Sequence, residues 1–413
     1  MYRRIFLVCI SILLVTGLLA GCAGESNENG SIIPVVKADS IGTNVVRANS
    51  VFAFNIFREM YKVDEEGNMF VSPASISTAL AMVMNGAKGN TLDEMIDALA
   101  FKGIDPAEIN SGFAYLVALL NRQEEGIELS LANSIWIREN FSVLESFKKV
   151  NSDYFAAAIR ELDFNKPDAA TTMNNWVKET TKGKIDRIVG DSINPDTVMF
   201  LINSIYFNGS WKVPFDPNRT YSSDFFIDGS PAGKVDMMNY KGDTLYHEGN
   251  GYKIISLTYG EGGVVMDLIL PGNGTGIRDF IEGFGVDDYI KAVDGLSTKT
   301  DVLVSIPKFK AEYETTLNDV LYSLGMKDIF GANCDLSGIN GTGDLFVSEV
   351  KHKTYIDVNE EGTEAAGVTS VEIRLTAAMD PTEFIADRPF MYTIRDTETE
   401  SILFMGVFDT PDQ

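Results

Sequence analysis

The order of helix-like and strand-like patterns along the chain is the feature that most restricts its fold. In the first half, apolar residues recur at helical spacing, as Ala53, Ile56 and Phe57 do. The helical runs are residues 49–62, 72–89 and 174–185. The second half carries short apolar runs rich in β-branched and aromatic residues, at 198–211, 263–271, 302–309 and 401–408. This segregation predicts an α+β domain with mixed or antiparallel sheets.

Turn residues mark the ends of the predicted helices. Ser72 followed by Pro73 is typical of a helix start, because a serine hydroxyl caps free N–H groups and proline fits the first turn. Gly86 and Gly89 are stop signals for that helix, and Gly183 is one for the helix at the later run. These signals favour compact helices bounded by short loops.

Composition and charge narrow the class of protein. Of 413 residues, 45% are hydrophobic and 23% are charged, which suffices for a large buried core. The net charge of −25 arises from 34 basic and 59 acidic residues. Such a surface repels phosphate backbones, so we expect no nucleic-acid partner. No linker or repeat interrupts the body of the chain, and residues 43–413 are predicted to form a single domain.

The first residues have the layout of an export signal. Arg3 and Arg4 precede an apolar run at residues 5–20, which is short for a membrane-spanning helix. The run ends in Leu-Ala-Gly-Cys at 19–22, which is similar to a lipobox, the site of cleavage and lipidation in bacterial-type lipoproteins. An ordinary cleaved signal and an uncleaved N-terminal anchor are the alternatives.

Cleavage before Cys22 would divide the start of the chain into a signal peptide, 1–21, and a flexible tether, 22–42, rich in Gly, Ser and Asn. Cys9 would then be lost and Cys22 would carry lipid, leaving Cys334 without a disulfide partner in the chain. We therefore expect an extracytoplasmic protein, secreted or attached to the cell surface through lipid alone.

The sequence gives no support for catalysis or metal binding. It holds two histidines, His247 and His352, and no nucleophile elbow, zinc-protease motif, phosphate-binding loop or paired cysteine motif. A catalytic triad is defined by geometry, but two histidines among many aspartates are common in chains of this length. No cluster of His and Cys has metal-ligand spacing. We therefore expect neither an enzyme nor a metal or other cofactor.

Residues 359–384, NEEGTEAAGVTSVEIRLTAAMDPTEF, alternate in side-chain size. The set that starts at the first threonine is small and then apolar: Thr363, Ala365, Gly367, Thr369, Val371 and Ile373. The intervening residues are mostly polar, so the segment has the pattern of a half-buried strand. Alanine and glycine form strands poorly, whereas small side chains lower the steric cost of sliding between two existing strands. An ordinary strand with some alanines is the alternative.

This segment and several others resemble the serpin family of serine protease inhibitors. EEGTEAAGVTS is similar to the proximal hinge of the reactive-centre loop, and NMFVSPASISTALAMVMNGAKGNT to the family's second-helix signature. Further matches follow in order: MNNWVKETTKGKI, LINSIYFNGSWKVPF, SIPKFKAEY, LGMKDIF and FMGVF. The similarity covers about residues 44–409. It implies three β-sheets, about eight or nine helices and an exposed reactive-centre loop at about 360–384.

The resemblance also assigns roles to residues of the loop. The matching hinge residues are Glu360, Gly362, Thr363, Ala365, Ala366 and Gly367. Gly362 would be the hinge glycine, and Thr363 the first residue to insert into the central sheet. Counting along the loop places the cleaved bond at Thr376-Ala377, but the loop is a residue or two longer than usual. The other candidates for the attacked residue are Arg374, Leu375 and Ala378.

Two further groups match the part of the sheet that must open. Trp211 and Lys308 match the breach, the point where the loop enters, and Lys308 would pair with Glu360. The polar cluster beneath the central strands, the shutter, is matched by Ser72, Ser75, Asn203 and His352. We expect the shutter to be a buried hydrogen-bonded network that governs how readily the sheet parts.

Two functions follow as hypotheses. The first is a suicide-type inhibitor that forms a covalent complex with a target serine protease, acts as a monomer and needs no cofactor. Thr or Ala at the cleaved bond would suit an elastase- or subtilisin-like pocket, whereas Arg374 would suit a trypsin-like one. The second is a serpin fold that no longer inhibits and serves as a surface or binding protein. The small inward-facing set of the hinge favours inhibition.

Overall fold

A computed structural model describes residues 41–64, 67–363 and 382–411 of the chain. These residues lie within one compact unit, Ile33–Gln413. Their α-helices are α1 (Ile41–Val63), α2 (Pro73–Met84), α3 (Gly89–Ala98), α4 (Pro106–Leu119), α5 (Glu145–Phe155), α6 (Ala169–Thr180), α7 (Ile277–Gly283), α8 (Val286–Asp294), α9 (Asn318–Ser323) and α10 (Ser337–Asn340). Two 3-10 helices, η1 (Pro217–Arg219) and η2 (Asp328–Phe330), complete the set. No described helix is both long and apolar enough to cross a membrane.

The ten α-helices of the described residues exceed the eight or nine that the family resemblance implied. The additional helices are short: α9 has 6 residues and α10 has 4, and neither has a side-chain cap. Helices this short complete at most two turns, so their sequences carry no repeating apolar pattern.

The start of α2 has the predicted geometry, whereas one of its predicted stop signals is wrong. The Ser72 side chain accepts a hydrogen bond from the Ser75 N–H, and Pro73 occupies the first helical position. The helix ends at Met84. Gly89 does not end this helix but is the first residue of α3. A glycine between two closely spaced helices fits either boundary, and the sequence pattern did not separate the two.

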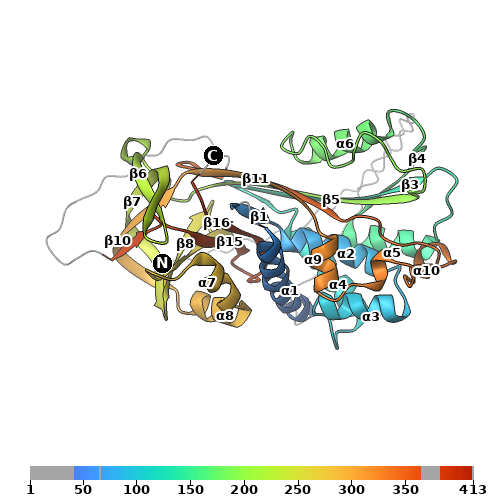
Figure 1. Ribbon diagram of the computed structural model, residues 1–413, viewed down its shortest axis with the longest axis horizontal. Helices are drawn as coiled ribbons and strands as arrows, with labels where there is room; N and C mark the ends of the chain where they lie inside the picture. The colour runs from blue at the N-terminus through green and yellow to red at the C-terminus, as the bar shows by residue number, and fades with distance from the viewer. Residues whose placement is uncertain (1–40, 65–66, 364–381, 412–413) are drawn as a thin grey trace, which may run out of the picture. The chain divides into compact units, whose positions relative to one another are not determined.

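A seven-stranded sheet has the order β11-β12-β13-β5-β3-β2, with β4 beside β3. Its strands are β2 (Gln123–Glu124), β3 (Ile127–Arg138), β4 (Ala158–Leu162), β5 (Met199–Ser210), β11 (Phe309–Thr316), β12 (Lys351–Asn359) and β13 (Gly362–Thr363). Helix α6 packs on β3 and β5 (Figure 1). On the opposite face α2 packs against β5. Successive side chains of a strand point to opposite faces of the sheet. Ile202 therefore packs in an apolar cluster with residues of α6, whereas its neighbour Asn203 forms a hydrogen bond with Ser75 of α2.

A second, nine-stranded sheet has the order β1-β16-β15-β9-β8-β7-β10-β14, with β6 beside β7. Its strands are β1 (Met69–Val71), β6 (Tyr221–Ile227), β7 (Ser230–Gly249), β8 (Tyr252–Tyr259), β9 (Val264–Pro271), β10 (Ser297–Pro307), β14 (Glu383–Ile385), β15 (Phe390–Asp396) and β16 (Ile402–Phe408). β7, 20 residues long, pairs with β6 and β10 and, near its end, with β8. The family resemblance implied three sheets. Among the described residues, β6, β7, β10 and β14 form a third set of strands, which β7 makes continuous with this sheet.

Three of the four predicted strands coincide with strands of the structure. The runs at 198–211, 263–271 and 401–408 correspond to β5, β9 and β16. The run at 302–309 spans the end of β10 and the first residue of β11, with Lys308 between them. Aromatic side chains join the two sheets, since the rings of Phe207 on β5 and Phe404 on β16 lie 5.9 Å apart. The α+β prediction is confirmed.

Candidate functional site

The short strand β13 lies between β12 and β5. The chain leaves β12, turns at Glu360 and returns antiparallel to both neighbours. Gly362 pairs with Asn359 of β12 and with Ser210 of β5, and Thr363 continues the ladder on both sides. The predicted hinge glycine and the predicted first inserting residue are thus already within the sheet.

Beyond Thr363 the facing edges of β12 and β5 have no strand partner among the described residues. Residues 351–357 of β12 pair with β11, and residues 199–208 of β5 pair with β3, each on the far side. We call this pair of facing edges the sheet opening. Unpaired strand edges present rows of backbone donors and acceptors, which an added extended segment can satisfy.

Gly362 lies where no other residue fits. A Cβ atom at this position would stand 2.1 Å from the Gly209 carbonyl oxygen and 2.7 Å from the Ser210 Cα. Its φ of +150° is also one that L-residues rarely adopt. The absence of a side chain at Gly362 thus allows close approach of β13 to β5.

We expect Gly362→Ala to displace β13 from the sheet, because backbone atoms cannot yield to the added methyl group. The free energy of unfolding should fall by about 1–3 kcal/mol, and the amides of β13 should exchange faster with deuterium. Gly331→Ala is the matched control, since nothing lies within 4 Å of a Cβ there and its backbone is extended at φ −139°. Urea unfolding and hydrogen exchange of both variants test the expectation, and equal behaviour would contradict it.

Glu360, at the turn before β13, is held by two side chains. Lys308 Nζ donates to one carboxylate oxygen at 2.8 Å, and Thr220 Oγ1 donates to the other at 2.9 Å. Burial alone would raise the pKa of Glu360, but these hydrogen bonds outweigh it and lower the pKa. The Glu360 side chain is 10% exposed, so the pair with Lys308 is more than a solvated surface contact.

Trp211 lies directly beneath the turn. Its indole N–H donates to the Asn359 carbonyl oxygen at 2.9 Å, and its backbone N–H donates to the Glu361 carbonyl oxygen at 2.9 Å. Its ring stacks on Tyr259, with centroids 4.3 Å apart. Trp211 thereby ties β5 to the end of β12 at the predicted entry point.

The shutter residues form two hydrogen-bonded arms that meet at the start of α2. On the β12 side, the Ser72 N–H donates to His352 Nε2 at 3.1 Å, and Ser72 Oγ donates to the Leu403 carbonyl oxygen at 2.7 Å. His352 is buried, and burial lowers its pKa to about 4. The imidazole is therefore neutral and accepts at Nε2, as the observed bond requires.

The second arm reaches β5. Ser75 Oγ donates to Asn203 Oδ1, and Asn203 Nδ2 donates to Asn133 Oδ1 at 2.7 Å. Asn133, on β3, in turn donates to the Phe155 carbonyl oxygen at the end of α5 at 2.8 Å. Asn203 and His352 thus face the same helix from opposite sides of the sheet opening. Sequence reasoning did not single out Asn133, because only the pairing of β3 with β5 brings it there.

The remaining predicted residues lie outside the described part of the chain. They are Ala365, Ala366 and Gly367 of the hinge, Arg374, Leu375, Thr376, Ala377 and Ala378 around the reactive bond, and Cys22. Within the described ranges, no group of three or more His, Cys, Asp or Glu side chains could hold a metal ion.

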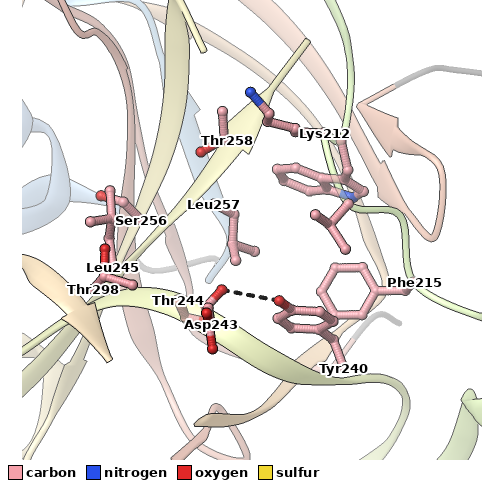
Figure 2. Close-up of a pocket in the computed structure, with 12 residues that line it drawn as sticks. Lys212, Phe215, Tyr240, Asp243, Thr244, Leu245, Ser256, Leu257, Thr258 and Thr298 are labelled. Atoms are coloured by element: carbon pink, nitrogen blue, oxygen red, sulfur yellow. Dashed lines mark hydrogen bonds between the residues drawn. The ribbon is translucent and has the colours of Figure 1, made fainter. Parts of the chain in front are cut away.

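A pocket of about 220 Å³ adjoins the breach (Figure 2). Trp211 is among the residues that line it. The rings of Phe215 and Tyr240 lie on one side of the pocket, and Leu257 faces them. The Tyr240 hydroxyl donates to the Asp243 carbonyl oxygen at 3.0 Å. Since the Phe215 N–H also donates to the Glu360 carbonyl oxygen at 2.8 Å, the pocket wall contacts the turn that precedes β13.

Comparisons with known proteins give one family. The model of the serpin family, described as serine protease inhibitors, matches residues 47–411. The leukocyte elastase inhibitor of Bos taurus is 34% identical over 381 residues, which cover 88% of this chain and 98% of that protein. The native-state crystal structure of tengpin, a thermophilic serpin, has a TM-score of 0.80 at 31% identity and covers 89% and 94% of the two chains. Human thyroxine-binding globulin in complex with thyroxine has a TM-score of 0.81 at 28% identity, covering 91% and 100%.

The chain belongs to the serpin family and has the serpin fold. At the level of the family, this membership defines protease inhibitors rather than catalysts. The similarity to a thyroxine-binding protein shows that the fold by itself does not distinguish inhibition from binding.

Proposed function

We propose that this protein is an irreversible suicide-type inhibitor of serine proteases. The observation that carries the proposal is the position of Gly362 and Thr363, paired on both sides within the sheet at the top of an opening whose edges have no other described strand partner. An inhibitor of this type needs a sheet that accepts its own loop as a strand. Gly362 and Thr363, to which the family resemblance assigns the start of that strand, pair with both β12 and β5, and this supports the proposal.

The chemistry would proceed on the protease. The serine hydroxyl of the target attacks the carbonyl carbon of the reactive bond, forms an ester with the loop, and releases the amine of the following residue as a new N-terminus. The freed loop then enters the sheet opening behind Thr363. Each inserted residue gains ladder hydrogen bonds, worth about 0.5–1.5 kcal/mol each in net terms. Insertion distorts the attached protease before water hydrolyses the ester.

The reactive bond we favour is Thr376-Ala377, with Arg374, Leu375 and Ala378 as the other candidates. A small residue at this bond fits an elastase- or subtilisin-like pocket, and similarity to a leukocyte elastase inhibitor supports that preference. We further propose that the protein works as a monomer outside the cytoplasm, attached through lipid on Cys22.

A panel of four proteases tests this function: an elastase, a subtilisin, a chymotrypsin and a trypsin. We expect a band on a denaturing gel at the summed mass of one protease and the cleaved protein. The mass of the released C-terminal peptide identifies the reactive bond. Loop cleavage without such a band, for every protease, would refute inhibition.

Loop cleavage without a covalent complex would favour a non-inhibitory binding protein. The pocket beside Trp211 and Phe215 is the specific observation for this alternative, since it provides a partly apolar site next to the hinge. The alternative predicts that cleavage of the loop leaves the protease free and active.

A further inference from the structure

Tyr259 belongs to the nine-stranded sheet but is fixed at the top of the other sheet. It is the last residue of β8, and it forms an isolated backbone bridge with Trp211 just after β5. Its ring stacks on the Trp211 ring at an interplanar angle of 14° and meets the Phe207 ring edge-on at 5.1 Å. The residue is fully buried. Aromatic contacts on both sides therefore hold the ring in one orientation.

The Tyr259 hydroxyl contacts the first residue of the loop to enter the sheet. It lies 2.7 Å from Thr363 Oγ1, and Thr363 is 1% exposed. Burial raises the pKa of Tyr259, so the phenol keeps its proton and the hydrogen bond persists at ordinary pH. Among the described residues, Thr363 is the only side-chain hydrogen-bond partner of this hydroxyl.

We propose that Tyr259 is a positioning residue that seats Thr363 in the sheet and so holds the loop at the start of its insertion path. Expulsion of the hinge would leave a buried phenol hydroxyl without a partner, which is costly. A threonine satisfies the hydroxyl and fills the site with its methyl group, whereas alanine would be small enough but could not bond. The proposal rests on the proposed function and adds a requirement for a hydroxyl at this position.

The test compares hydrogen exchange of the hinge in the intact, uncleaved protein. Tyr259→Phe should speed exchange of the amides in residues 359–363 about tenfold, the factor expected from one net hydrogen bond. Thr363→Val, equal in shape but without the hydroxyl, should give the same increase. Thr363→Ser, which keeps the hydroxyl, should stay close to the wild type. Tyr246→Phe is the control, since it removes a tyrosine hydroxyl that donates to Glu248 and not to a hinge residue.

Energetic coupling between Tyr259 and Thr363 is the decisive test of the proposal. The double variant Tyr259→Phe/Thr363→Val should exchange no faster than either single variant, because both remove the same bond. Multiplied effects, or unchanged exchange in Tyr259→Phe, would overturn the proposal. Since exchange is measured without any protease, this result is independent of whether the protein inhibits. If it does inhibit, the stoichiometry of inhibition should rise in Tyr259→Phe and in Thr363→Val but not in Thr363→Ser.

Discussion

Replacing Thr363 by arginine should turn the protein from an inhibitor into a substrate. The Thr363 side chain is 1% exposed and packs at the Tyr259 hydroxyl, so an inserted arginine would bury a guanidinium without a carboxylate partner. The cost of burying an unpaired charge is several kcal/mol. A penalty of about 3 kcal/mol on insertion corresponds to a loss of covalent complex of roughly a hundredfold. The acyl-enzyme would then hydrolyse before the loop enters the sheet.

The measurement is the yield of covalent complex on a denaturing gel, with the protease that the wild type captures. Glu361→Arg is the matched control, because Glu361 is the half-buried neighbour at the turn and lies outside the inserted strand. It should retain inhibition. If Thr363→Arg still captured the same protease as well as the wild type, insertion behind Thr363 would not be the mechanism of this protein.

Acid should destabilise the protein through His352. The imidazole is buried, accepts from the Ser72 N–H, and has a pKa lowered from 6.5 to about 4 by burial. As the pH falls, His352 therefore becomes protonated near pH 6.5 in the unfolded chain but only near pH 4 in the folded chain. The stabilisation is complete above the unfolded pKa and is lost as the pH falls toward the folded one. The loss from this group amounts to about 3 kcal/mol.

Urea unfolding between pH 7.5 and 4 tests this dependence. His352→Gln should flatten the part of the pH profile below about 6.5, since the substituted side chain does not titrate there. His247→Gln removes the other imidazole and serves as the matched control. Identical pH profiles for wild type and His352→Gln would show that the shutter histidine does not carry the acid sensitivity.

The parts of the fold that the sequence predicted are those with local patterns. Strands β5, β9 and β16 coincide with continuous apolar runs, and α2 begins at the serine-proline pair that predicted it. The contact of Lys308 with Glu360 followed from the family resemblance and is present in the structure. Each of these depends on residue order or on a motif whose partners are known from the family.

The contacts that the sequence did not predict join segments that lie far apart along the chain. Tyr259 and Thr363 are 104 residues apart, and Asn133 and Asn203 are 70 apart, so no local pattern connects them. Thr220 reaches Glu360 from the loop before β6 for the same reason. The joining of the third strand set to the nine-stranded sheet likewise follows from the course of β7, which passes from one set to the other.

The two serines at the start of α2 have a mechanical consequence. Ser72 donates a hydrogen bond to His352 of β12, on one side of the sheet opening. Ser75, about one helical turn further on, donates one to Asn203 of β5, on the other side. Because one rigid helix is hydrogen-bonded to both strands, β12 and β5 cannot move apart unless one of these hydrogen bonds breaks or the helix tilts. Substitutions in the buried face of α2, such as at Ile76 or Leu80, should therefore change how easily the sheet widens.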